Sequence, residues 1–502
     1  MKKLISMAII AAMCMMMFAV NITATEVSDG LAAEQSDNSA SDGTKFSFGP
    51  GENNPEVYTA GGIDGYIAKE LNQTIVATVT VETTNIYTLY VNCFGVGGSK
   101  QLDVNVNGVT AAAIETSADE WGEVAVVATL NAGENEVTLV PSWSWYVADY
   151  VRIEPAVLPE VVPNSSLANP NATDETQGLM NYLASVYTKN ILSGQQEIYK
   201  YGPHEFEYEF EWLLETTGKS PAIRAFDFLN YSNPCVGANT NESYNFGDDD
   251  GTIERMIDWT NTKNGIVTAS WHITVPKNFA GYTLGDRVEW ADYTYEDDMS
   301  DFVAANVYID GTKENEFYKT ALDKLAGGMQ ILEDEKIPLI WRPLHEAQGQ
   351  WFWWSGEGPE VYVELWKYTY NYLVKEKGLD NLIWEWNGYA QADNQLWYPG
   401  DDYVDLVAYD KYNALDTNGD WKDDTPNESA ISSTFYDLVG SFGQKMIAMS
   451  ENDTVPSLKN LVDGKAYWLY FCPWYESPEA QFLTVLNDPN TLSELYNSEY
   501  CI

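Results

Sequence analysis

The pattern of hydrophobic and polar residues divides the chain into two parts of different character. Residues 45–155 carry short runs in which apolar and polar side chains alternate, such as Thr74–Val81 and Leu102–Val106. Alternation with a period of two is typical of β-strands that bury one face. The pair Asn107-Gly108 separates two of these runs and favours a tight hairpin turn. We therefore predict an antiparallel β-sandwich for residues 45–155.

From residue 177 onward, continuous apolar runs alternate with segments of helical period. Eight such runs are present, and nearly every one ends in a polar or aromatic residue. Strands that alternate with helices indicate an α/β domain with parallel strands, and eight of them predict a (β/α)8 TIM barrel over residues 177–502. The eight runs cover 191–195, 221–227, 265–272, 337–346, 381–387, 403–410, 445–451 and 466–471.

Three other segments flank or join these domains. Residues 1–24 start with Lys2 and Lys3, continue as an apolar run and end in small residues, which is typical of a secretory signal peptide. Residues 25–44 are rich in Ser, Asp, Glu, Ala and Gly and are predicted to be disordered. Residues 156–176 are predicted to be a semi-stiff linker, before a helix capped by Thr176. We expect a secreted, extracellular protein whose mature form has no membrane span.

Composition narrows the range of partners. The chain has 75 acidic and 27 basic residues, a net charge of −48, which argues against nucleic acid and anionic membranes. With 18 Trp and 33 Tyr the chain is unusually aromatic; some of these residues must belong to the core, but carbohydrate-binding surfaces also use such residues. Cys93, Cys235, Cys472 and Cys501 show no metal-ligand spacing, so we interpret them as structural thiols or as members of at most two disulfides.

The fourth apolar run ends in Arg342, His345 and Glu346, and a cluster of indoles that includes Trp351 and Trp354 follows at once. A carboxyl group beside indoles at the end of a buried strand is typical of the rim of a barrel active site. Apolar surroundings would raise the pKa of Glu346 toward that of a useful acid. The alternative, core aromatics beside a solvated carboxylate, is less favourable because these polar groups are hard to satisfy together in a core.

A second carboxyl group, Glu451, ends the seventh run. The strand ends of one barrel can bring Glu346 and Glu451 across a cleft from each other. Two carboxyl groups that flank a glycosidic bond are the minimum for hydrolysis, since one protonates the leaving oxygen and the other attacks the anomeric carbon. Most of the 75 acidic residues are expected to be solvated. These two differ from the rest because each follows an apolar strand and precedes a polar loop.

Other strand ends supply candidate binding residues. His272 ends the third run, and we expect it to hydrogen-bond sugar hydroxyls, because no third ligand at metal-site spacing accompanies it. Tyr412 follows the sixth run and is placed to donate to Glu451 and keep it ionised. Trp474 follows the eighth run and is a candidate floor for the subsite in which the sugar distorts.

The second domain resembles glycoside hydrolase family 26, whose members are chiefly endo-β-1,4-mannanases. The resemblance rests on Trp341-Arg-Pro-Leu-His-Glu346 with Trp351-Phe-Trp-Trp354, Asp410-Lys-Tyr412, Ala448-Met-Ser-Glu451-Asn-Asp453 and Trp468-Leu-Tyr-Phe-Cys-Pro-Trp474. It implies a retaining mechanism, with Glu346 as acid/base and Glu451 as nucleophile, that requires no cofactor or metal. It also implies that the subsites around the cleaved bond are lined by His272, Arg342, His345, Trp351, Trp354, Tyr412 and Trp474.

The first domain resembles carbohydrate-binding module family 35. This resemblance rests on Val104-Asn-Val-Asn107-Gly108, Leu130-Asn-Ala-Gly-Glu-Asn-Glu-Val137 and Ala148-Asp149-Tyr150-Val-Arg-Ile153. It implies Trp143, Trp145 and Asp149 as sugar-contact positions. That family often binds a structural calcium through an acidic motif in its first strand. Here the strand reads Phe46-Ser-Phe48 without the acid, which leaves a calcium site in this module open.

The leading hypothesis is a secreted, monomeric, retaining endo-β-1,4-mannanase that acts on mannan, glucomannan or galactomannan and carries a mannan-binding module. It predicts catalytic carboxyl groups about 5–5.5 Å apart. One alternative is the same fold and mechanism acting on β-1,3-1,4-glucan or β-1,3-xylan. Another is a non-catalytic glycan-binding protein with an inert barrel. The sequence alone leaves endo against exo action and the tolerance of galactose branches undecided.

Overall fold

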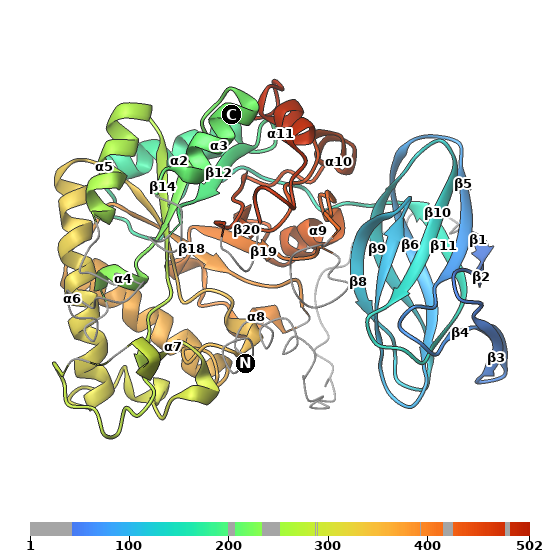
Figure 1. Cartoon of the computed structure of the whole chain (residues 1–502), viewed down its shortest axis with the longest axis horizontal. Coiled ribbons are helices and arrows are strands. Elements are labelled where there is room, and N and C mark those ends of the chain that lie inside the picture. Colours follow the sequence, from blue (N-terminus) through green and yellow to red (C-terminus); the bar gives the residue numbers. More distant parts are fainter. Residues whose placement is uncertain are drawn as a thin grey trace, which may run out of the picture. The chain divides into compact units, whose positions relative to one another are not determined.

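A computed structural model describes residues 43–198, 206–232, 251–286, 288, 290–391, 393–414, 425–476 and 482–502. These residues form two compact units that divide between Ala156 and Val157 (Figure 1). The predicted signal peptide and most of the predicted disordered segment lie outside the described residues.

The first unit consists of two antiparallel sheets, which confirms the predicted sandwich architecture. One sheet has the strand order β3-β4-β11-β6-β9, with β1 paired to β11, and the other has the order β2-β5-β10-β7-β8. Asn107 and Gly108 adopt φ values of +53° and +82°, as the predicted hairpin turn requires. The strands are β1 Thr44–Ser47, β2 Gly49–Pro50, β3 Glu56–Ala60, β4 Ile63–Ala68, β5 Ile75–Val81, β6 Asn85–Gly95, β7 Gln101–Val106, β8 Val109–Glu115, β9 Trp121–Leu130, β10 Gly133–Pro141 and β11 Tyr146–Pro155.

The second unit is a barrel of eight parallel strands, as predicted. The strands neighbour one another in the order β20-β19-β18-β17-β14-β13-β12-β21. Backbone hydrogen bonds close the ring, since Leu469 N donates to Ile447 O at 2.8 Å and Asn452 N donates to Cys472 O at 3.1 Å. The strands are β12 Leu192–Gln196, β13 Ile223–Asp227, β14 Ile266–Trp271, β17 Leu339–Pro343, β18 Leu382–Asn387, β19 Leu406–Lys411, β20 Met446–Asn452 and β21 Tyr470–Phe471, and a separate hairpin joins β15 Val275–Pro276 to β16 Tyr293–Thr294.

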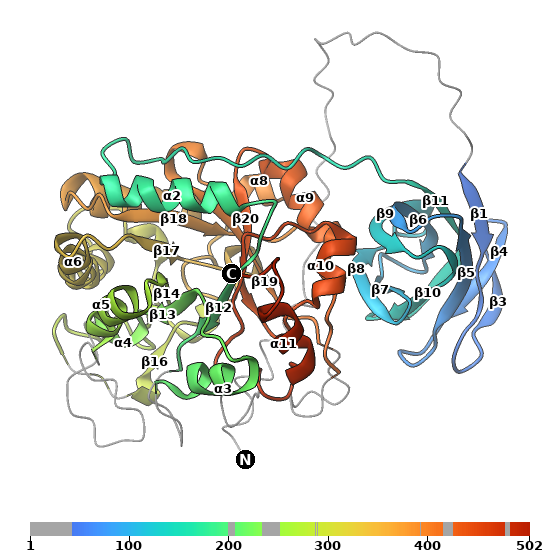
Figure 2. The same ribbon diagram turned by 90° about the horizontal axis from the view of Figure 1, so that it is seen from above.

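Helices alternate with these strands and surround the barrel, with α5, α6 and α7 along one side and α2 across β18 (Figures 1 and 2). The predicted helix over 361–377 is an α-helix that continues into a π-helical turn, η5 Asn371–Glu376, and ends before Gly378 at φ +75°. The helices are α2 Asp174–Val186, α3 Tyr208–Thr217, α4 Leu229–Ser232, α5 Thr252–Lys263, α6 Lys313–Asp334, α7 Pro359–Tyr370, α8 Asn394–Trp397, α9 Ser432–Phe442, α10 Leu458–Gly464 and α11 Pro489–Tyr496.

Part of the predicted linker belongs to the barrel unit. The backbone N–H of Ala168 donates to Asp405 at 2.6 Å, and the side chain of Asn169 donates to Asp380 at 2.8 Å. The helix that follows is capped by Thr173 and not by the predicted Thr176, whose backbone N–H donates to the Thr173 hydroxyl at 3.1 Å. Ala168 and Asn169 are therefore bound to the buried Asp405 and the half-buried Asp380 of the barrel, and the free part of the linker is shorter than predicted.

The described cysteines do not form disulfides. Cys93, Cys472 and Cys501 are buried free thiols, which agrees with the structural role predicted for them. Cys235 lies outside the described residues. Within the described ranges, no helix has both the length and the apolar character that crossing a membrane requires.

Candidate active site

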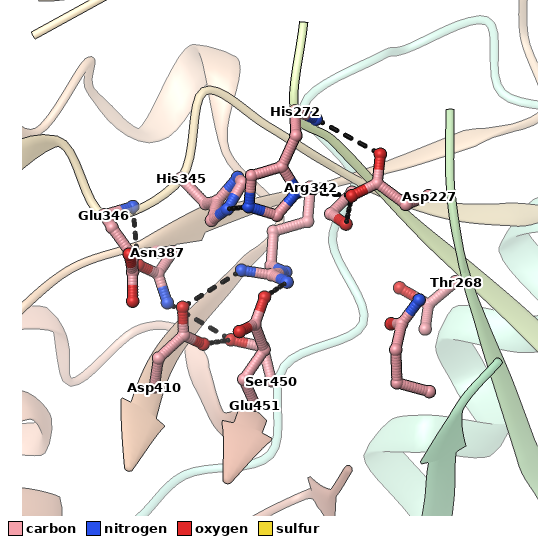
Figure 3. A network of polar contacts seen from close by, with 12 residues as sticks. Asp227, Thr268, His272, Arg342, His345, Glu346, Asn387, Asp410, Ser450 and Glu451 are labelled. Carbon is pink, nitrogen blue, oxygen red and sulfur yellow. Dashed lines mark hydrogen bonds and ion pairs between the residues drawn. The ribbon is translucent and has the colours of Figure 1, made fainter. Parts of the chain in front are cut away.

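Three acidic side chains meet at one end of the barrel, at or just after strands β17, β19 and β20 (Figure 3). Glu346 follows β17, Asp410 lies in β19, and Glu451 lies in β20. One carboxyl oxygen from each of them lies within 4.8 Å of the other two. The two glutamates predicted from distant parts of the sequence therefore meet, and they do so at the carboxyl end of the barrel.

A left-handed backbone turn presents the Glu346 side chain. Leu344 and Glu346 adopt φ values of +49° and +53°, a conformation that costs non-glycine residues about 1–3 kcal/mol each and concentrates at functional sites. Asn387, at the end of β18, holds this turn because its side-chain oxygen accepts the Glu346 backbone N–H at 2.8 Å. The neighbouring strand thus fixes the direction in which the Glu346 carboxyl group points.

The surroundings of Glu346 favour its protonated form. Burial raises the pKa of this carboxyl group well above its usual value, and the negative charges of Asp410 and Glu451 raise it further. Trp351 Nε1–H donates to one carboxyl oxygen at 3.2 Å, and the Tyr389 hydroxyl donates to the other at 3.2 Å. A carboxyl group that keeps its proton near neutral pH suits a general acid.

Glu451 is held by two donors, one on each oxygen. Arg342 Nη2 donates to Oε1, and the Tyr412 hydroxyl donates to Oε2 at 2.7 Å, as predicted for Tyr412. The same guanidinium donates to Asp410 at 3.1 Å, and the Ser450 hydroxyl donates to that residue at 2.6 Å. Burial nevertheless raises the pKa of Asp410 to about 7. The site therefore holds the side chain of Glu451 in a fixed orientation beside a carboxyl group that favours its proton, Glu346.

Three carboxyl oxygens so close together could in principle bind a metal ion. The Arg342 guanidinium, however, already donates to Asp410 and Glu451, so a cation would have to displace a charge that is in place. Metal ligands must also be deprotonated, whereas Glu346 favours its protonated form. The donor set fits an ion-paired acid cluster better than a metal centre.

The predicted aromatic residues lie at different depths around the carboxyl groups. Trp351 and Trp474 are half-buried, and the Trp474 ring lies 5.8 Å from that of His272. Trp354 is fully buried, and its Nε1–H donates to the backbone oxygen of His345 at 2.9 Å. The prediction that Trp354 lines a subsite is therefore wrong for this structure. An indole packs well in a core once its N–H has a hydrogen-bond partner. Trp354 therefore packs behind the residues that surround the carboxyl groups.

The two predicted histidines lie in one hydrogen-bonded chain. Nδ1 of His272 contacts the carboxylate of Asp227, and its Nε2 lies 2.9 Å from Nε2 of His345. Burial lowers the pKa of His345 well below its usual value. Both nitrogens of the His272 ring thus have protein partners, which differs from the expectation that this ring hydrogen-bonds sugar hydroxyls.

Comparison with known proteins identifies the family of the chain. The family model for glycosyl hydrolase family 26 matches residues 168–502. The chain belongs to glycosyl hydrolase family 26. It is 32% identical over 455 residues to a mannan endo-1,4-beta-mannosidase of Thermothelomyces thermophilus, a match that covers 89% of this chain and 85% of that protein. It is 33% identical over 420 residues to mannan endo-1,4-beta-mannosidase B of Piromyces sp., with coverages of 82% and 67%.

Two solved structures of family 26 mannanases are similar to this family 26 hydrolase. A ruminal GH26 endo-beta-1,4-mannanase superposes with a TM-score of 0.68 at 40% identity, over 89% of this chain and 92% of that one. The Podospora anserina GH26-CBM35 beta-(1,4)-mannanase superposes with a TM-score of 0.60 at 29% identity, over 92% and 98%. The second likeness covers the sandwich as well as the barrel, which fits the presence of an additional N-terminal module in this glycoside hydrolase.

Sequence reasoning assigned no role to four residues of the hydrolase site. Asp227, Asn387 and Asp410 are the polar ends of the second, fifth and sixth apolar runs, so the signal that identified Glu346 and Glu451 applied to them too. Tyr389 lies beyond the end of β18, where no spacing rule points to it. Its role follows only from its hydrogen bond to Glu346.

In the sandwich, the predicted sugar-contact tryptophans are on the surface. Trp143 and Trp145 are 53% and 47% exposed in the loop between β10 and β11, a position in which large aromatic side chains are available to a ligand. Asp149 is half-buried in β11. Among the described residues, the one group of three acidic, histidine or cysteine side chains close enough for a metal lies in the barrel. A calcium ion also binds backbone and amide oxygens, so a calcium site in this module stays a prediction.

Proposed function

We propose that this hydrolase is a secreted endo-β-1,4-mannanase that cleaves internal bonds of mannan, glucomannan or galactomannan with retention of configuration. The retaining mechanism is proposed because carboxyl oxygens of Glu346 and Glu451 lie within 4.8 Å of each other. Retaining glycosidases need a separation of about 5–5.5 Å, and inverting enzymes need about 6.5–9.5 Å to admit a water molecule. The names of the two curated relatives support mannan as the substrate.

In the first step, Glu346 gives its proton to the glycosidic oxygen while a carboxylate oxygen of Glu451 bonds to the anomeric carbon. The bond between that carbon and the leaving oxygen breaks, and the leaving chain departs as an alcohol. In the second step, Glu346 takes a proton from water, and the water oxygen bonds to the anomeric carbon. The bond between the anomeric carbon and Glu451 breaks as the new bond forms, which restores both carboxyl groups to their starting forms.

The contacts around the two residues suit these roles. Arg342 and Tyr412 donate to different oxygens of Glu451, so they orient the carboxylate for attack. The negative charge of Glu451 is one cause of the raised pKa of Glu346. Because the ester has no charge, its formation removes that cause and lowers the pKa of Glu346 at the stage when this group must act as a base.

The deciding experiment measures products and rates together. The wild type should release reducing sugar from mannan faster than from lichenan or β-1,3-xylan, with long intermediate products first and with the β-anomer formed initially, as seen by NMR. Glu451→Ala should abolish turnover while it still binds mannan. A faster rate on either of the other polysaccharides would identify that polysaccharide as the substrate in place of mannan. A first product with inverted configuration would show that Glu451 is not the nucleophile.

Secretion forms part of the proposal and is supported by the composition of residues 1–24. Protein recovered from the culture medium should begin near residue 25 when its N-terminus is sequenced. We further propose that the protein acts as a monomer and that its sandwich binds mannan through Trp143 and Trp145, the two exposed indoles. Light scattering of the mature protein tests the first of these statements.

A further inference from the structure

Asp227, His272 and His345 form a chain of side chains at the edge of the site that the proposed reaction does not use directly (Figure 3). Asp227 ends β13, His272 directly follows β14, and His345 immediately precedes Glu346. The side chain of Asp227 is fully buried and that of His272 is 15% exposed. The chain thus connects a buried acid two strands away with the residue beside the proposed acid/base.

Donors contact both oxygens of the Asp227 carboxylate. Oδ1 accepts the backbone N–H groups of Leu229 at 2.7 Å and of His272 at 3.2 Å. Oδ2 accepts the Ser270 hydroxyl at 3.1 Å and also contacts Nδ1 of His272. A carboxylate can only accept hydrogen bonds. The hydrogen of this last contact therefore belongs to His272 Nδ1.

This position of the hydrogen fixes the next bond in the chain. A neutral imidazole that carries its hydrogen on Nδ1 has a bare Nε2, which can only accept. Nε2 of His345 lies 2.9 Å from Nε2 of His272, so His345 must supply the hydrogen between the two rings. The Nδ1 of His345 is then bare, and within the part of the chain that the structure describes it is buried without a hydrogen-bond partner.

We propose that Asp227 is a positioning residue that fixes both imidazoles in one tautomeric state and thereby orients the His272 ring within the aromatic surface beside Glu346. The His272 ring packs edge-on against Trp474 at 5.8 Å and Phe352 at 5.6 Å, so its orientation shapes the aromatic surface that a sugar would meet. The effect on catalysis depends on the proposed function. The tautomeric states do not depend on it, because they are a property of the protein without substrate.

Asp227→Asn tests this assignment sharply, because the backbone decides how the new amide must lie. The two backbone N–H groups at Oδ1 require the amide oxygen there, so the NH2 group faces Nδ1 of His272. That nitrogen must then accept, which moves the His272 hydrogen to Nε2 and the His345 hydrogen to Nδ1. The variant should therefore invert the tautomers of both rings with little change in volume.

Nitrogen-15 NMR of histidine-labelled full-length protein measures the outcome directly, and the chain has only three histidines, His204 included. In the wild type, His272 should show a pyrrole-type Nδ1 and a pyridine-type Nε2, with assignments from single His→Gln variants. Asp227→Asn should exchange these signals and lower kcat on mannan by about 10–100-fold, the range known for carboxylates that orient metal-binding imidazoles. KM should change much less.

Ser270→Ala is the matched control, since it removes a hydrogen bond to the same carboxylate oxygen and leaves the acceptor in place. It should retain the wild-type tautomers and lower kcat far less than Asp227→Asn. A wild-type spectrum with Nε2–H on His272 overturns the assignment without any variant. Loss of activity in Asp227→Asn with unchanged tautomers also overturns it, because the residue would then act through packing. Correct tautomers in a protein that hydrolyses no polysaccharide would instead refute the proposed function.

Discussion

Tyr412 extends from the end of β19 and donates a 2.7 Å hydrogen bond to Glu451 on the adjacent strand β20. A hydrogen bond to a charged group contributes about 1.5–3 kcal/mol. Tyr412→Phe keeps the ring and removes this donor, so we expect kcat/KM on mannan to fall by roughly 10–100-fold. Tyr398→Phe is the control, because it removes a bond of the same length to the exposed carboxylate of Asp401. Equal rates for both variants would show that the Tyr412 bond does not prepare the proposed nucleophile, Glu451.

The pH dependence should report the protonation of Glu346. Because the proposed reaction uses this group first as an acid and burial raises its pKa, kcat/KM should fall as the pH rises through that pKa. The Tyr389 hydroxyl donates to the ionised form and so lowers the pKa of Glu346. Tyr389→Phe should therefore move the alkaline limb of the kcat/KM profile to higher pH. A shift of that limb to lower pH would contradict this account of Glu346.

Gly349 makes room for the indole of Trp351. A Cβ at this position would lie 2.0 Å from Cζ3 of Trp351, so Gly349→Ala must displace the ring that donates to Glu346. A shift of about 1 Å in a positioned group can cost about 100-fold in rate, and we expect a loss of up to that size in kcat/KM. Gly327→Ala, in helix α6 with nothing near the added Cβ, should keep full activity. Full activity in Gly349→Ala would mean that the position of Trp351 is unimportant.

Glu209 should make the barrel less stable as the pH rises. Burial raises its pKa from 4.5 to about 8 in the folded state. Between these values the folded protein holds a proton that the unfolded chain has lost, so stability decreases with rising pH. Glu209→Gln removes this dependence and should raise the melting temperature at pH 8 relative to wild type by about 2 °C or more, with a smaller gain at pH 5. The exposed Glu211→Gln on the same helix should show no such difference between the two pH values.

The exposed indoles of the sandwich should determine retention on insoluble polysaccharide. Removal of a central aromatic contact usually costs more than about 1 kcal/mol of binding free energy. We expect Trp143→Ala and Trp145→Ala each to weaken retention on insoluble mannan by about tenfold or less, and the double variant to be retained least. Pull-down isotherms measure this, and hydrolysis of soluble mannooligosaccharide checks that the barrel is intact. Undiminished retention of the double variant would place the binding surface elsewhere.

The eight barrel strands were predictable because a parallel strand with helices on one side and core on the other is apolar on both faces. The runs that end in Glu346 and Glu451 were equally visible, since a carboxyl group at the end of such a run has few uses in a core. The residues at which each strand begins and ends were harder to predict. The eighth run was predicted over 466–471, whereas β21 comprises only Tyr470–Phe471.

The partners of the site residues were much harder to predict. Tyr389 and Asn387 act on Glu346 from 43 and 41 positions away in sequence. The depth of Trp354 was misjudged, because adjacent indoles in sequence can point to a cleft or to the core, and only packing decides which. Asp227 was visible as a strand end, but its pairing with His272 depends on the register of β13 with β14.

The sequence by itself determined the two kinds of domain, the order of the barrel strands and the two carboxyl groups that could carry the chemistry, because periodicity and burial are local properties of a chain. The tertiary structure decided which donors meet those carboxyl groups, how the Glu346 turn is held and which nitrogens of the histidines are occupied. Closing the barrel sets these contacts, since closure fixes the distances between strand ends that no local pattern encodes.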